Sequence, residues 1–293
     1  MYRLVVMTVL IAACTPQQAS PEPGSAVTTS STSTTASVVD IPTTSTATTA
    51  PSTTAPPDPH ARPEWLGTRP LPLRDDGFGQ VLPTPPELED RAFATPDVLP
   101  PPEEGAELAG SWIPAPPEVL ARSTWNPDCP VSSEQLAYVT VSHWGFDDRY
   151  HTGELLVSIA HADAIISVFT VLAEARFPIE EMRIIRPDEL DLPPTGDGNV
   201  TTAFVCRPVV GSSSWSMHAY GEAIDINPFH NPYVRGDLVL PELATTYADR
   251  TNLRPGMIAE GNVVVAAFDS IGWEWGGRWT SLSDPMHFST TGR

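Results

Sequence analysis

Basic residues are scarce in this chain. Its 293 residues include 16 Lys and Arg against 36 Asp and Glu, which gives a formal net charge of −20. Nucleic acid and anionic membrane surfaces would repel such a protein, so the charge argues against binding to either through the protein's own charge. We therefore expect no nucleic-acid partner. The sequence also shows no internal repeat.

A short, mainly apolar run opens the chain. Arg3 is followed by residues 4–13 and then by Cys14, and this run is too short to span a bilayer. Small residues just before a cysteine are typical of a bacterial lipoprotein signal peptide, in which the cysteine is lipidated. We predict such a signal over residues 1–14, with Cys14 as the lipid anchor. An ordinary cleaved signal or a chance apolar start is the alternative.

This signal predicts export to the cell envelope. The protein would then be anchored on the outer face of the cytoplasmic membrane or secreted, and the membrane would be a partner only through the N-terminal lipid. Of the three cysteines, Cys129 and Cys206 remain, and an oxidising compartment allows them to bond. We predict a Cys129–Cys206 disulfide, with two free thiols as the alternative.

Proline divides the chain into a tether and a domain. The 33 prolines are too many for a chain that is compact throughout. Residues 15–63 consist mostly of Ser, Thr, Pro and Ala, which cannot nucleate a core, and residues up to about 110 stay proline-rich. The sequence therefore predicts a disordered tether over residues 15–111, its second half semi-rigid, and a folded domain over residues 112–293.

Apolar patterns in the domain predict an α+β fold. Residues 139–141 and 182–185 are short, branched runs typical of strands, and residues 188–200 have the composition of a loop. Apolar residues recur at helical spacing over residues 155–175, and Pro178 follows them. A second helix is predicted over residues 261–272, where a glycine ends the apolar run.

Two short motifs carry chemistry. His218 and Asp225 lie seven residues apart around Gly221, and both side-chain types bind zinc. If residues 222–226 form a strand, Asp225 projects from a rigid element. His287 is the third ligand candidate, and Asp284 precedes it by three residues. That spacing suits a base that takes a proton from water activated at a metal. Each motif alone is weak, because such pairs also arise by chance.

The two motifs together form a longer pattern. Ser-x-His-x-x-Gly-x-Ala-x-Asp at 216–225 is followed by Asp-x-x-His at 284–287. This pattern resembles the D-alanyl-D-alanine carboxypeptidase family of zinc peptidases, which includes the vancomycin-resistance D,D-peptidases and the L-alanyl-D-glutamate endolysins. The resemblance extends over residues 125–289 and does not reach the tether.

The resemblance implies a fold, a Zn²⁺ cofactor and individual roles. The fold would be of the hedgehog and D,D-peptidase type, α+β, with a small antiparallel sheet and flanking helices that carry the zinc site. His218, Asp225 and His287 match the family's metal ligands. Asp284 matches its catalytic acid/base carboxylate, and Ser216 matches a serine that contacts substrate.

Arg207 matches an arginine that stabilises the reacting carbonyl. A fixed cation aimed at a developing oxyanion lowers the barrier by about 3 kcal/mol, while a surface ion pair is the alternative role. Trp279 lies nearest the Asp284 motif among the aromatic residues that could either line a peptide groove or fill the core, and we expect it to contact substrate. The other members of that set are Trp215, Tyr220, Trp273 and Trp275.

The chain departs from the family in two places. The family often has glutamate at the position of Asp284, and many members have an acidic residue at the position of Arg278. Aspartate at 284 favours the endolysin-like subgroup, whereas an exported, tethered chain favours a wall-remodelling enzyme. The bond that is cut stays open at this point.

The leading hypothesis is hydrolysis of peptidoglycan stem peptides by a D-alanyl-D-alanine carboxypeptidase, with the stem peptide as its partner. An L-alanyl-D-glutamate-type endopeptidase, a non-catalytic cell-wall-binding module and a spacer lipoprotein are the alternatives. The spacer leaves the clustered site residues without explanation.

Overall fold

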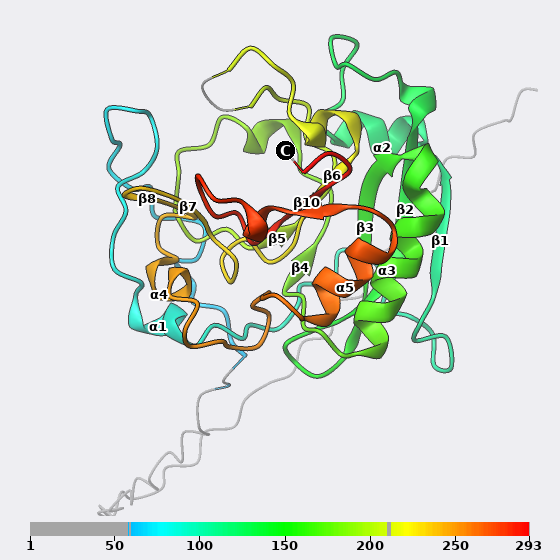
Figure 1. The fold of residues 1–293 in the computed structure, drawn as a ribbon. Coiled ribbons are helices and arrows are strands. Elements are labelled where there is room, and N and C mark those ends of the chain that lie inside the picture. The colour runs from blue at the N-terminus through cyan, green and yellow to red at the C-terminus, as the bar shows by residue number, and fades with distance from the viewer. Residues whose placement is uncertain (1–57, 59, 210–211, 293) are drawn as a thin grey trace, which may run out of the picture. The chain divides into compact units, whose positions relative to one another are not determined.

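The computed structural model describes residues 58, 60–209 and 212–292, and all of them belong to one unit, Ala55–Arg293 (Figure 1). The predicted signal peptide, Cys14 and residues 15–57 of the predicted tether lie outside the described residues. Among the residues that are described, no helix is long and apolar enough to cross a membrane.

The unit is α+β, as predicted, with small, mostly antiparallel sheets and few helices. The helices are α1 (Pro86–Glu89), α2 (Pro117–Arg122), α3 (Ala162–Glu174), α4 (Thr245–Ala248) and α5 (Val263–Ser270). The strands are β1 (Gly110–Pro114), β2 (Leu136–Trp144), β3 (Tyr150–Ser158), β4 (Glu181–Met182), β5 (Val200–Thr201), β6 (Ala223–Asp225), β7 (Tyr233–Arg235), β8 (Leu238–Leu240), β9 (Glu274–Trp275) and β10 (His287–Ser289). Short 3₁₀ turns are η1 (Ser133–Gln135), η2 (Ile159–His161), η3 (Pro187–Glu189), η4 (Met217–Tyr220) and η5 (Gly276–Arg278).

The β1–β2–β3 sheet separates two hydrophobic layers. Alternate side chains of a strand point to opposite faces. On β2, Val139 and Val141 pack in the core with α3 and α5, while Leu136 packs in a second core with α2 and Phe204. In Figure 1, α3 lies against this sheet. The sheet therefore has a buried layer on each face.

The helix predicted over residues 155–175 begins later than expected. The prediction is confirmed from Ala162 to Glu174 but wrong for residues 155–158, which belong to β3. Leu155, Leu156 and Val157 are all buried, because both faces of β3 are covered. A run that is apolar on both faces has no period that distinguishes a strand from a buried helix.

Most other predicted elements are present with shifted ends. The strand expected at 139–141 lies within β2, and the one expected at 222–226 is β6. The run at 182–185 contributes only Met182 to a strand. Helix α5 lies within the stretch predicted as a helix, residues 261–272. It begins at Val263 because the Asn262 side chain accepts a hydrogen bond from the Val264 amide and caps its start.

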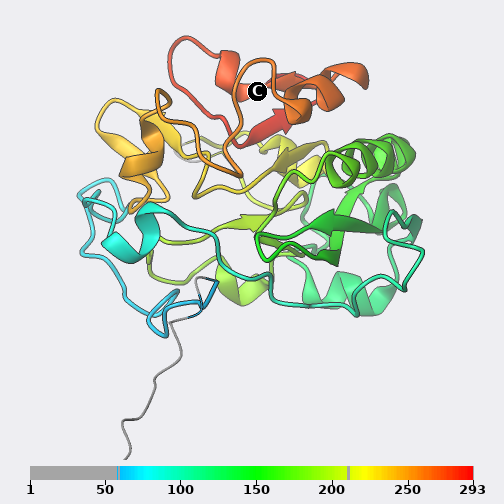
Figure 2. The same ribbon diagram turned by 90° about the horizontal axis from the view of Figure 1, so that it is seen from below.

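The N-terminal extension packs on the domain, so the tether predicted up to residue 111 is wrong for residues 60–111, the last two of which belong to β1. Leu88 and Phe93 are buried against Phe229 and Tyr247. Figures 1 and 2 show this segment, coloured blue to cyan, along the outside of the domain. Its scattered apolar residues have no helical or strand period, and their burial depends on residues far along the chain.

A buried ion pair fixes this extension. Arg91 donates to both oxygens of Glu180, at 2.6 and 2.7 Å, and to the Asp197 carbonyl at 2.7 Å. Burial acts to raise the pKa of Glu180, but the charge and hydrogen bonds of Arg91, together with the charges of Arg62 and His230, outweigh it, so the pKa lies below its usual value. Glu180 is therefore held as a carboxylate beneath the extension.

The predicted disulfide is confirmed. Cys129 and Cys206 are bonded, with their Cα atoms 5.9 Å apart and a sequence separation of 77. The bridge ties the segment after α2 to the chain just before Arg207.

Candidate active site

His218 is presented by the 3₁₀ turn η4. The Ser216 hydroxyl accepts a hydrogen bond from the His218 amide at 3.3 Å and so caps the turn. Gly221 ends the turn at φ +69°, a left-handed conformation that glycine adopts without strain. A Cβ atom there would lie 2.5 Å from the Ser158 amide nitrogen, so the turn packs directly on the end of β3.

The orientation of the His218 ring follows from its hydrogen bond. Nδ1 lies 2.6 Å from the carbonyl oxygen of Ala203. A carbonyl only accepts, so Nδ1 carries the proton and Nε2 presents its lone pair on the opposite side of the ring. Nε2 lies 3.2 Å from Oδ2 of Asp225.

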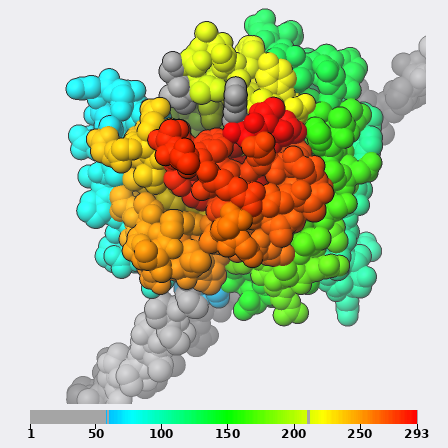
Figure 3. Space-filling model, viewed as in Figure 1, coloured from blue at the N-terminus to red at the C-terminus, as the bar shows by residue number. Residues whose placement is uncertain are grey.

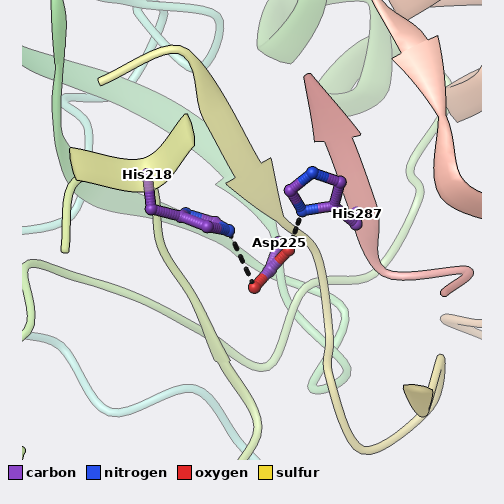
Figure 4. Close-up of side chains that lie close together, drawn as sticks. All are labelled: His218, Asp225 and His287. Carbon is purple, nitrogen blue, oxygen red and sulfur yellow. Dashed lines mark hydrogen bonds and ion pairs between the residues drawn. The ribbon is translucent and has the colours of Figure 1, made fainter. Parts of the chain in front are cut away.

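Asp225 and His287 face each other across two paired strands. The antiparallel register of β6 and β10 pairs Asp225 directly with His287, although 62 residues separate them. Nδ1 of His287 lies 3.0 Å from Oδ1 of Asp225. Figure 4 shows the carboxylate between the two imidazoles, with His218 coming from the turn and the other two residues from the strands.

These three residues fit a zinc ion. Each offers one ligand atom, and those atoms lie within 4.8 Å of one another. Tetrahedral zinc with bonds of about 2.1 Å places its ligand atoms about 3.4 Å apart, which this spacing accommodates. Burial acts to raise the pKa of Asp225, but His218 and His287 outweigh it and hold the pKa well below its usual range. Two histidines and one carboxylate leave a coordination position for a reactant, as in catalytic zinc sites.

The expectation that flanking helices carry the site is not met. A 3₁₀ turn and two strands supply the three residues. Paired strands give Asp225 and His287 fixed backbone positions, whereas the turn places His218 over them.

Asp284 lies in a tightly held loop before β10. Its amide donates to the Gly276 carbonyl at 3.2 Å, and its own carbonyl accepts from the His287 amide at 3.1 Å. A Cβ atom on Gly276 would lie 2.6 Å from the Asp284 carbonyl oxygen, so only glycine permits this approach. The indole of Trp275 donates to the Pro285 carbonyl at 2.8 Å. The Trp275-Gly276 pair therefore positions the carboxylate.

The environment of Asp284 suits proton transfer. As a whole the residue is half-buried, but its Oδ1 is shielded from solvent and has no hydrogen-bond partner among the described residues. Burial, and then the charge of Asp225, raise the pKa of Asp284 to about 7, while His287 and Arg207 act to lower it. A carboxyl group with a pKa near neutrality can both accept and return a proton.

Arg207, Ser216 and Trp279 line the same cleft as the cluster, whose volume is about 1860 Å³. Arg207 is half-buried and close enough to Asp284 for its charge to lower that pKa. Ser216 is buried and caps η4, so its first role is to position His218. The Trp279 ring lies 5.5 Å from the His287 ring.

The remaining aromatic residues divide between groove and core. Trp215 lines the cleft and is 36% exposed. Trp273 and Trp275 are buried in the main core, and Tyr220 packs against the second one.

Sequence reasoning missed a further part of the cleft. Tyr233 and Arg235 line it from β7, and Leu66, Gly67 and Thr68 line it from the N-terminal extension. No spacing motif in the sequence marks these residues.

The comparison with known families agrees with the motifs. Residues 210–290 match the model of a family described as D-alanyl-D-alanine carboxypeptidase. No curated protein and no solved structure matches the chain. Arg207 lies just before the matched stretch. The match supports the family inferred from the sequence over residues 210–290, a stretch that holds His218, Asp225, Asp284 and His287 and is similar to the D-alanyl-D-alanine carboxypeptidase family.

Proposed function

We propose that the chain is a zinc-dependent peptidase that hydrolyses peptidoglycan stem peptides, acting as a D-alanyl-D-alanine carboxypeptidase. One observation carries the proposal. A His-Asp-His cluster and a separate shielded carboxylate, Asp284, share one cleft, within a segment that matches the family model. A binding module would need neither an open metal position nor a carboxyl group with a pKa near neutrality.

His218, Asp225 and His287 would hold the zinc ion. Bound there, zinc supplies a Lewis acid that polarises a scissile carbonyl and lowers the pKa of water. Asp284 accepts a proton from the attacking water at its shielded Oδ1 and returns it to the leaving amine. Arg207 donates to the carbonyl oxygen as negative charge develops on it. Trp279 and Ser216 contact the peptide from the walls of the cleft.

Export accompanies this function. A stem peptide lies outside the cytoplasmic membrane, and the Cys129–Cys206 bridge supports a location in an oxidising compartment. Lipidation of Cys14 would hold the enzyme at the membrane. Mass spectrometry of the N-terminal fragment from cells would find a lipid on Cys14, and an unmodified cysteine would remove that part of the proposal.

The activity is tested with defined stem pentapeptides and the full chain. We expect zinc-loaded protein to release terminal D-alanine, as read by mass spectrometry, and a chelator to abolish release until zinc is restored. Asp284→Asn should lose at least about 100-fold in kcat, whereas Asp188→Asn, an equal change at an exposed position outside the cleft, should not. Internal cleavage would identify an endopeptidase, and no zinc-dependent cleavage would favour the binding module.

A further inference from the structure

The β7–β8 hairpin presents one face to the cleft. Its register pairs Tyr233 with Leu240 and Arg235 with Leu238. Residues two apart on a strand share a face, and paired residues lie on the same side of a ribbon. All four of these side chains line the cleft that contains the metal cluster. The hairpin is therefore a wall of the site, although no motif includes it.

Backbone hydrogen bonds fasten this wall to the Asp284 loop. The Val234 amide donates to the Ser283 carbonyl at 2.8 Å, and the Ser283 amide donates to the Val234 carbonyl at 3.0 Å. Figure 3 shows the gold hairpin beside the red C-terminal segment. Burial raises the pKa of Tyr233, the charge of Arg235 acts to lower it, and the charge of Asp284 acts to raise it. The charges of Arg235 and Asp284 therefore both lie near the Tyr233 ring.

Arg235 is the arginine of this wall, and its charge is available. Among the other arginines of the cleft, Arg62, Arg91 and Arg183 are paired with Glu180, Glu181 or Glu189. Arg207 also lines the cleft, and its charge acts on Asp284. Arg235 is exposed, rests near the face of Tyr233 at 6.0 Å from the ring centroid, and pairs with no carboxylate in the described part of the chain. Asp237, the acidic residue of the hairpin, pairs instead with Arg74. In a protein of net charge −20, a cation left unpaired inside a cleft is suited to an anionic ligand.

The position beside Asp284 indicates which part of a substrate reaches Arg235. Asp284 must return its proton to the leaving amine, so the residue that carries this amine lies along the wall next to Asp284. We propose that Arg235 is a specificity residue that binds the α-carboxylate of the residue whose amine leaves. The inference rests on the proposed peptidase function.

Two bonds of a stem peptide offer this chemistry. In D-alanyl-D-alanine the leaving residue is terminal and carries a free α-carboxylate. In L-alanyl-D-glutamate the chain continues through the side-chain carboxyl of glutamate, so the α-carboxylate is again free. Arg235 would thus favour either bond over one whose leaving residue has an amide at this position.

The test compares acid and amide forms of both bonds with the full, zinc-loaded chain. One peptide pair ends in D-alanyl-D-alanine or its C-terminal amide, and the other contains L-alanyl-D-glutamate or L-alanyl-D-isoglutamine. For the bond that is cut, we expect wild type to favour the acid about tenfold in kcat/KM, mainly through KM, because the contact forms in substrate and transition state alike. Arg235→Gln should reduce this preference to about twofold or less, and Arg235→Lys should retain part of it. Arg186→Gln removes an exposed arginine outside the cleft and should leave the preference unchanged.

Each outcome decides between the two proposals. An acid preference that persists in Arg235→Gln, or a wild type that cuts acid and amide equally, would overturn the role of Arg235. If only the L-alanyl-D-glutamate bond is cut and its acid preference depends on Arg235, the carboxypeptidase proposal fails and the inference stands. If wild type cuts neither bond, both fail.

Discussion

Replacing Gly221 with alanine should destabilise the domain through its contact with β3. The residue lies at φ +69°, and a Cβ atom would be 2.5 Å from the Ser158 nitrogen and 2.8 Å from the Val157 carbonyl carbon. The left-handed backbone costs a non-glycine residue about 1 to 2 kcal/mol, and overpacking against backbone adds about 1 to 3 kcal/mol. We expect Gly221→Ala to lose about 3 kcal/mol of unfolding free energy, which lowers Tm by about 10 °C in a domain of this size.

The same change should weaken zinc binding, because relief of the clash moves η4 and His218. Ligand positions must be held within about 0.5 Å, so affinity should fall about tenfold or more in a competition assay with a chromophoric chelator. Gly272→Ala is the matched control, since Gly272 has φ +79° with nothing within 4 Å of its Cβ position. It should cost only about 1 kcal/mol and leave zinc affinity unchanged. Equal losses for the two variants, measured by thermal unfolding, would refute the packing argument.

Glu180→Gln leaves the buried Arg91 without its counterion, so it should lower the free energy of unfolding by about 3 to 5 kcal/mol in chemical denaturation. It should also speed proteolysis within residues 60–109, whereas the control Asp188→Asn should do neither. Unchanged proteolysis would show that the ion pair does not hold the extension. The folded-state pKa of Asp284, about 7, lies above its ordinary value of 3.8, so the stability that its proton contributes is fully present below about pH 4 and is lost as pH rises through 7. In chelator, Asp284→Asn should therefore exceed wild type in stability at pH 8 and match it near pH 4, and a pH-independent difference would contradict the shift. Zinc at about 1,000 times its Kd should stabilise wild type by about 4 kcal/mol in calorimetry but leave His287→Ala nearly unchanged.

Local patterns in the sequence predicted the residues of the candidate site better than they predicted how the chain packs. His218 and Asp225 lie on a turn and a strand that follow each other directly around Gly221, so their spacing could be recognised within one short stretch of sequence. The pairing of Asp225 with His287 spans 62 residues, and only the family resemblance linked them.

The errors arose where distant residues decide the structure. Residues 155–158 join β3 because β2 pairs with them, which no local period reveals. Arg91 fixes the N-terminal extension through Glu180, 89 residues away, so a proline-rich composition alone suggested a tether. Arg235 lines the cleft because of the hairpin register and the hydrogen bonds between Val234 and Ser283, and neither can be derived from the sequence around it.

We propose that one zinc ion in the His218, Asp225 and His287 cluster and the Asp284 carboxyl group act together on a peptide bond. The most direct test titrates zinc into chelator-treated full-length protein and follows bound metal and D-alanine release from a stem pentapeptide in the same samples. We predict that wild type gains activity in step with one bound zinc, that Asp284→Asn binds one zinc without activity, and that His287→Ala does neither. Full activity without zinc, or an Asp284→Asn variant as active as wild type, would contradict the account.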